Sequence, residues 1–109
     1  MNVYDEAHNL ARAIKESGEF KEFDRMRKEL EQDADASKMI GEMQQLQAQL
    51  QAAQMTGQQP DQDVMNRLQR LGTMIATKPV AARFMQAQVA FTIMMNDVFG
   101  IIGEAVGLQ

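Results

Sequence analysis

The chain of 109 residues contains no cysteine. This absence excludes disulfide bonds, cysteine-ligated zinc, iron–sulfur clusters held by cysteine and catalysis by a thiolate. It is compatible with a reducing compartment. The first residues, MNVYDEAHNL, are acidic and amphipathic, unlike a secretory signal peptide. We therefore expect a cytoplasmic protein.

Tryptophan is also absent, and aromatic side chains are limited to five Phe and one Tyr. The large buried side chains must therefore be mostly Leu, Ile, Val and Met. The chain has only two prolines, and no alternating run of Val, Ile and Thr indicates a β-strand. Its length is typical of one domain. We predict a single all-α domain over residues 1–109.

Residue patterns that would support catalysis or metal binding are missing as well. His8 is the only histidine. Its spacing from Asp5 matches one acid-x-x-His element of a di-iron helical bundle, but such a site needs two elements and two further carboxylates. The glycines are isolated, so there is no phosphate-binding loop, and no Ser/His/Asp set can be assembled. We predict a protein that is not an enzyme and binds no metal or cofactor.

A long hydrophobic run is the last missing feature. The most apolar stretch, residues 84–96, contains 13 residues before Asp97. A helix that spans a bilayer needs about 20 apolar residues. We therefore expect no membrane-spanning segment.

The sequence does contain strong helical periodicity. Apolar residues recur at spacings of 3 and 4 along most of the chain, and this spacing predicts amphipathic helices. We expect five helices, over about residues 3–17, 19–32, 34–56, 61–77 and 79–106.

The third and fourth helices are expected to form a long antiparallel hairpin with coiled-coil seams. One seam consists of Ala36, Met39, Met43, Leu46, Leu50 and Ala53, and the other of Val64, Leu68, Leu71 and Ile75. Asp33 can cap the first arm, and Gly57 can end it in a left-handed conformation. Pro79 fits the first turn of the last helix. The predicted fold is a five-helix antiparallel bundle with a long central hairpin and a long C-terminal helix.

The last expected helix, residues 79–106, is too long for a compact monomer. At about 1.5 Å per residue it extends roughly 40 Å, whereas a compact domain of this size has a radius of gyration of roughly 13 Å. Its apolar stripe needs cover, which a second copy provides most simply. We predict a homodimer or higher oligomer whose interface includes Phe84, Phe91, Met94, Met95, Val98, Ile101 and Ile102.

The net charge of −4 argues against a general nucleic-acid-binding protein. The charges are distributed unevenly, because residues 1–63 hold 13 acids and 7 bases, whereas residues 64–96 hold four bases and no acid. Two interpretations of the basic segment 67–83 remain open. It pairs with the acidic half of the chain, within the fold or across a dimer, or it docks an acidic partner or RNA.

The chain is also rich in methionine, with ten residues. Methionine fills irregular cores, and it is common on adaptable binding surfaces. Four of these residues lie off the expected seams: Met55, Met65, Met85 and Met95. The candidate partner surface combines two of them with the four bases, and consists of Met55, Met65, Arg67, Arg70, Lys78 and Arg83.

Four stretches carry a family resemblance, in order along the chain: YDEAHNLARAIKESGEFKEFDRMRKEL, EQDADAS, the Gln-rich arm ending QMTGQQP, and KPVAARFMQAQ. They include the series A-x-x-L-A-x-A-I-x-x-S at residues 7–17 and E-F-K-x-F at residues 19–23. Together they resemble the YlbF/YmcA-like family of small helical bacterial proteins, and within it the YheA-like branch. The match covers nearly the whole chain.

The resemblance implies an all-helical, oligomeric, cytoplasmic protein without catalysis of its own. The best-known members join a complex that assists an RNA-processing endoribonuclease and affects competence, biofilm formation and sporulation. Those members carry cysteines linked to an iron–sulfur cluster, which this chain cannot hold because it has no cysteine.

Our leading hypothesis is an adaptor that acts through protein–protein contacts, with other proteins of an RNA-processing complex as candidate partners. The alternative is an RNA-associated accessory factor that uses the basic segment 67–83.

Overall fold

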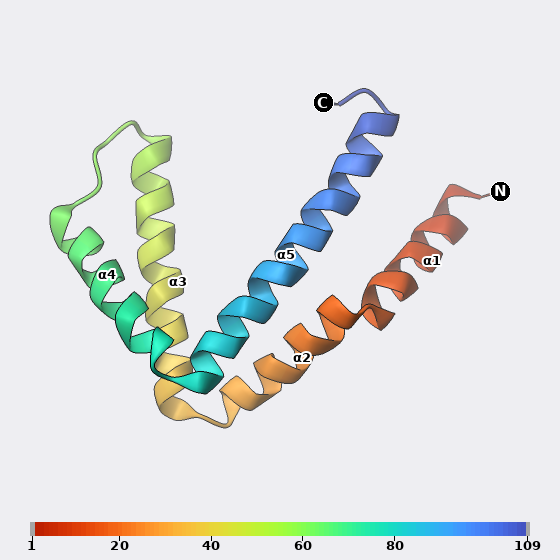
Figure 1. Cartoon of the computed structure of the whole chain (residues 1–109). Helices are drawn as coiled ribbons and strands as arrows, with labels where there is room; N and C mark the ends of the chain where they lie inside the picture. The colour runs from red at the N-terminus through yellow and green to blue at the C-terminus, as the bar shows by residue number, and fades with distance from the viewer. Residues whose placement is uncertain (1, 109) are drawn as a thin grey trace. The chain divides into compact units, whose positions relative to one another are not determined.

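The structure, a computed structural model, describes residues 2–108 and is all-helical over that range. Its five helices are α1 (Val3–Glu16), α2 (Gly18–Glu31), α3 (Ala34–Met55), α4 (Gln62–Ala76) and α5 (Pro79–Ala105) (Figure 1). The prediction of an all-α chain with five helices is confirmed, and each helix end lies within one residue of its expected position.

The helices divide into two compact units. The hairpin unit, residues 29–83, contains α3, α4, the last residues of α2 and the first turn of α5. The terminal unit, residues 2–28 and 84–108, contains α1 and most of α2 and α5. The expectation of a single domain stays a prediction, and we describe each unit by itself.

The helices end where local side-chain and backbone chemistry satisfies their terminal groups. The Asn2 side chain accepts a hydrogen bond from the backbone N–H of Tyr4 at 2.8 Å and so caps α1. The Ser17 hydroxyl oxygen accepts from the N–H of Phe20 at 3.1 Å at the start of α2. Gly57, with a φ of 75°, ends α3 in the left-handed conformation expected from the sequence. Asp61 caps α4 from just outside the helix.

In the hairpin unit, α3 and α4 lie side by side as the expected antiparallel arms (Figure 1). The buried residues are Leu30 at the end of α2, Ala36, Ile40, Met43 and Leu46 on α3, Leu71 and Ile75 on α4, and Ala81 on α5. Ile40 therefore replaces Met39 of the expected seam, and Met39 is only half-buried. Met39 and Ile40 follow Ala36 by three and four residues, so both lie one turn from it on the same side of the helix, and the structure buries the second.

Asp33 connects the two ends of the hairpin unit. Its Oδ1 accepts a hydrogen bond from the N–H of Ala36 at 3.0 Å, which caps α3 as expected. Its Oδ2 lies 3.4 Å from Nζ of Lys78, the residue just before α5. The Ala36 N–H and, to a lesser extent, the Lys78 ammonium hold the pKa of Asp33 below its usual value. One base of the segment 67–83 thus pairs with an acid within the fold.

The terminal unit is held by an aromatic cluster between α2 and α5. The rings of Phe23 and Phe91 stack with centroids 5.2 Å apart and an interplanar angle of 5°. Phe23 also contacts Phe84, and Phe20 contacts Phe91, each pair at 5.7 Å. Four of the five Phe residues are used in this way. Ring pairs of this geometry contribute beyond their buried area.

By length and composition α5 also meets the minimum for a membrane-crossing helix. Asp97 ends the most apolar stretch of the sequence, but the helix continues to Ala105. The core helix of a soluble protein meets the same criterion but is mostly buried, whereas 6% of the most apolar window of α5 is buried. The expectation that no segment spans a membrane stays a prediction.

We predict that Asp33→Ala lowers the melting temperature by a few degrees, because α3 loses its cap and Lys78 its partner. Asp33→Asn should lower it less, since an amide oxygen can still accept from Ala36.

The same pair of variants predicts a pH dependence. Because folding lowers the pKa of Asp33, its carboxylate stabilises the fold above the unfolded-state pKa of about 4, and this contribution is lost as the pH falls through the folded-state pKa. The difference in melting temperature between the wild type and Asp33→Asn, measured by circular dichroism, should therefore shrink on acidification. A difference that stays constant would contradict the role of the charge.

Phe23→Ala should destabilise the chain by about 2 kcal/mol or more, because one substitution removes the contacts to both Phe84 and Phe91. Urea unfolding measures the change in the free energy of unfolding. Phe23→Leu, which keeps much of the apolar volume, serves as the control and should lose less. Equal losses for the two variants would argue against a specific contribution from ring stacking.

Candidate functional site

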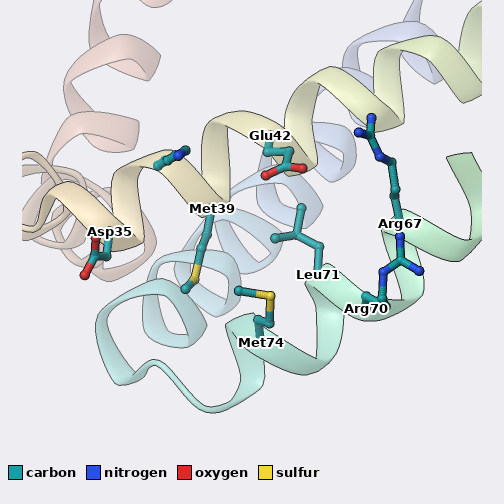
Figure 2. A pocket seen from close by; sticks show the side chains of 8 residues that line it. Asp35, Met39, Glu42, Arg67, Arg70, Leu71 and Met74 are labelled. Atoms are coloured by element: carbon teal, nitrogen blue, oxygen red, sulfur yellow. The ribbon is translucent and has the colours of Figure 1, made fainter.

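A groove of about 360 Å³ lies between α3 and α4 in the hairpin unit. We call it the hairpin groove, and it is lined by Asp35, Lys38, Met39 and Glu42 from α3 and by Arg67, Arg70, Leu71 and Met74 from α4 (Figure 2). All eight residues belong to one unit. The groove follows directly from the pairing of the two arms.

The floor of the hairpin groove is apolar. Met39 and Met74 point into the space between the two helices, with Leu71 beside them (Figure 2). Leu71 is 5% exposed and also belongs to the core, whereas Met74 is 50% exposed. Two flexible thioether side chains at the edge of a packed core make this floor adaptable in shape.

The rim of the hairpin groove is charged. Asp35, Lys38 and Glu42 stand on α3, and Arg67 and Arg70 stand one turn apart on α4. All five are exposed. Within residues 2–108, neither arginine forms an ion pair, in contrast to Lys78. Arg67 also lines the two neighbouring hollows toward the hairpin tip. The rim thus presents two guanidinium groups that are available to a ligand.

The structure brings together only part of the partner surface expected from the sequence. Arg67 and Arg70 share the hairpin groove, whereas Lys78 is half-buried against Asp33 and Arg83 is exposed outside the groove. The two methionines of the expected surface, Met55 and Met65, are 82% and 42% exposed but do not line the groove. The role of all these residues in binding stays a prediction.

Sequence reasoning missed Met74 as a member of this surface. The available signal was its spacing, because Met74 follows Arg70 by four residues and Arg67 by seven. Side chains at these spacings share one helix face. The contribution of α3 had no such signal, since it depends on how the two arms pack.

Part of the expected oligomer interface on α5 is buried by contacts within the chain itself. Phe84 is only 4% exposed and packs on Phe23, and Phe91 is half-buried in the same aromatic cluster. Phe84 therefore lies within the chain and not on its surface. Met94, Met95 and Val98 are half-buried, whereas Ile101 and Ile102 are 68% and 47% exposed.

Several large apolar residues of α5 that were not expected at the interface are exposed. Val89 and Ile93 line a shallow apolar hollow with Met85 and Ala90, and both are more than half exposed, as is Phe99. Val106, just after the end of α5, is also more than half exposed. On α1, Val3 is 80% exposed and Leu10 37%. These apolar stripes extend along helices of the terminal unit.

Two carboxyl groups have pKa values below their usual range, and both take part in ion pairs. The pKa of Asp24 is lowered by a hydrogen bond and charge from Lys28, and by those of Arg27. The pKa of Asp33 is lowered by the N–H of Ala36 and by the Lys78 ammonium. A carboxyl group that serves as a general acid at neutral pH needs a raised pKa. Within residues 2–108, no cluster of three or more His, Cys, Asp or Glu side chains is placed to hold a metal ion.

The fold and these surfaces define a small all-helical protein with uncovered apolar faces and a charged interhelical groove. The family described as "Control of competence regulator ComK, YlbF/YmcA" matches residues 3–107. This chain belongs to the YlbF/YmcA family. The recognition from sequence is confirmed at this level, while the assignment to the YheA-like branch stays a prediction.

Relatives of similar length support the assignment. A UPF0342 protein of Clostridium novyi is 33% identical over 106 residues, which cover 97% of this chain and 93% of the relative. UPF0342 proteins of Symbiobacterium thermophilum and Desulfitobacterium hafniense are 35% and 34% identical, over 98% and 97% of this chain and 96% and 86% of their own lengths.

Two solved structures share the fold. A protein of unknown function (DUF964) from Bacillus stearothermophilus matches with a TM-score of 0.81, at 22% identity, over 96% of this chain and 92% of its own. A chain of the crystal structure of Bacillus subtilis RicA in complex with RicF matches with a TM-score of 0.62, at 22% identity, over 96% and 93% of the two chains. At this level of identity the likeness concerns the fold alone.

Proposed function

We propose that this protein is a non-catalytic, cytoplasmic adaptor that self-associates and acts through contacts with other proteins. The observation that carries the proposal is the uncovered apolar surface of α5. The family to which the chain belongs is described by the control of a competence regulator, and one structural neighbour comes from a complex of two proteins. A regulatory role through protein contacts agrees with both.

The apolar face of α5 supports self-association through its energetic cost. Phe99 and Ile102 are three residues apart, so they share one side of the helix, and they are 61% and 47% exposed. Val89 and Ile93, four residues apart, are 54% and 56% exposed. Burying apolar surface gains roughly 25 cal/mol per Å². Soluble monomers rarely leave large contiguous apolar patches in water. A second copy of the chain is the simplest cover.

We expect multi-angle light scattering at micromolar concentration to give a mass of at least two chains. Phe99→Glu with Ile102→Glu should shift the mass toward that of one chain, because it places charges in an apolar interface. Gln51→Glu on the exposed face of α3 serves as the control and should leave the mass unchanged. A wild-type mass equal to one chain would overturn self-association.

The adaptor role needs a partner other than the protein itself. We expect affinity purification after cross-linking in cells, at native abundance, to recover other proteins reproducibly, with those of RNA-processing complexes as the first candidates. The exposed groove and apolar faces of the terminal unit are the surfaces that support this expectation. Recovery of the protein alone would count against the adaptor role.

Binding of RNA is the second candidate function, favoured by the two unpaired arginines of α4. The arrangement of the basic segment gives it less support, because Lys78 is already paired with Asp33 and the carboxylates of Asp35 and Glu42 stand on the same groove as the arginines. Binding of phosphates needs a continuous basic face. The bases at these positions are interrupted by acids and do not form one.

We therefore expect labelled single-stranded RNA to bind no more tightly than about 100 µM at physiological salt. Fluorescence anisotropy measures the affinity, and replacement of Arg67, Arg70, Lys78 and Arg83 by Gln provides the comparison. Tighter, salt-dependent binding that these substitutions abolish would favour the RNA-associated alternative.

A further inference from the structure

We propose that the hairpin groove binds a helical segment of a second protein, and that this segment presents an apolar anchor flanked by carboxylates. The inference rests on the proposed function as an interaction protein and specifies the chemistry of its partner. It concerns α3 and α4, whereas the self-association argued above concerns α5.

The apolar floor sets the first requirement for the partner. A volume of about 360 Å³ lies near the lower end of the range of ligand pockets, roughly 300–1,000 Å³. It suits one or two large apolar side chains better than an extended ligand. Met39 and Met74 can adjust to the shape of such an anchor. A helix laid along a groove between two helices presents anchors at this scale.

The arginines set the second requirement. Arg67 and Arg70 share one face of α4 and have no ion-pair partner within the described residues. Their own stretch of sequence cannot neutralise them, because residues 64–96 contain no acid. Guanidinium groups bind carboxylates through two parallel hydrogen bonds. A carboxylate that follows the anchor along the partner helix would complete the charge pattern.

One acid on the α3 side, Asp35, sets the orientation, because Glu42 has the cation of Lys38 one turn away on the same face of α3. Asp35 lies in the first turn of α3, and Arg67 lies in the first half of α4. Because the arms are antiparallel, Asp35 is at the base of the hairpin and the arginines are nearer its tip. The partner's carboxylates should therefore face the tip end. A uniform polyanion such as RNA would meet Asp35 and Glu42 unfavourably, which is why we favour a protein segment with mixed charge.

The test uses the full-length protein and a displayed library of four-turn helical peptides with randomised charges and apolar positions. Selected peptides are synthesised with a fluorescent label, and their dissociation constants are measured by anisotropy. We expect them to share a large apolar residue with Asp or Glu within one turn of it. Arg67→Glu with Arg70→Glu should weaken their binding by about tenfold or more.

Two controls separate the groove from general charge and hydrophobicity. Arg12→Glu with Lys21→Glu makes the same change in net charge at exposed positions outside the groove and should change affinity by less than about twofold. Met74→Glu should weaken binding as strongly as the arginine variants, whereas Tyr4→Glu, also exposed but outside the groove, should not. Circular dichroism verifies that each variant is folded.

Three results would overturn the proposal. The first is a selection that yields no peptide whose binding depends on Arg67 and Arg70. The second is a set of selected peptides that are basic. The third is labelled RNA that binds through these arginines when no peptide does. Light scattering on the same samples reports self-association separately. If the protein forms oligomers but binds no such peptide, the proposed function stands and this inference is wrong. If the protein binds such peptides but has the mass of one chain, this inference stands and self-association is wrong.

Discussion

The base of the hairpin unit is held by the carboxylate of Asp33, which makes two different contacts. Asp33 accepts a hydrogen bond from the free N–H of Ala36 in the first turn of α3 and lies against the ammonium of Lys78. The first interaction fixes where α3 begins, and the second joins that point to the end of α4. Both interactions lie at the base of the hairpin, so they tie the two arms together at the end of the unit that is opposite its tip. Beyond the base, buried apolar residues such as Leu46 and Leu71 hold the arms together.

The distribution of apolar residues explains why the two units behave differently. In the hairpin unit, core positions are filled on α3 and α4, and the outer faces carry Gln and charges. In the terminal unit, the aromatic cluster uses only one stretch of α5, from Phe84 to Phe91. The remainder of α5 keeps large side chains such as Phe99 and Ile101 exposed. The chain has few aromatic residues, and four of its five Phe residues meet at this one contact, so it does not cover the rest of the apolar surface of α5.

Local features of the fold could be predicted from the sequence because each has a local cause. The cap at Asp33, the left-handed Gly57 and the helix start at Pro79 depend on neighbouring backbone groups alone. The choice between Met39 and Ile40 for the core could not be made in the same way. Both residues are apolar and both lie one turn beyond Ala36, so the choice depends on how α4 packs against α3.

The same limit applies to the surfaces. Phe84 has the spacing of an interface residue, yet it packs on Phe23, which lies far away in the sequence. The periodicity of the sequence predicted the apolar stripe of α5. It did not indicate which part of that stripe α2 covers. Likewise, the arginines of α4 were visible as charges, but the acids that face the same groove come from α3. Side chains that meet only through tertiary packing leave no pattern in a single sequence.

Residues of α4 contribute both to the core of the hairpin unit and to the hairpin groove, which links stability to recognition. Leu71 is almost fully buried and also forms part of the groove floor. Arg67, Arg70 and Met74 flank it on the side that faces solvent. A ligand that seats an apolar group against this floor would therefore extend the core of the hairpin, not merely touch its surface. Because a small helical hairpin has a thin core, such added burial is a large fraction of its stability, so binding and the stability of the hairpin unit are expected to be coupled.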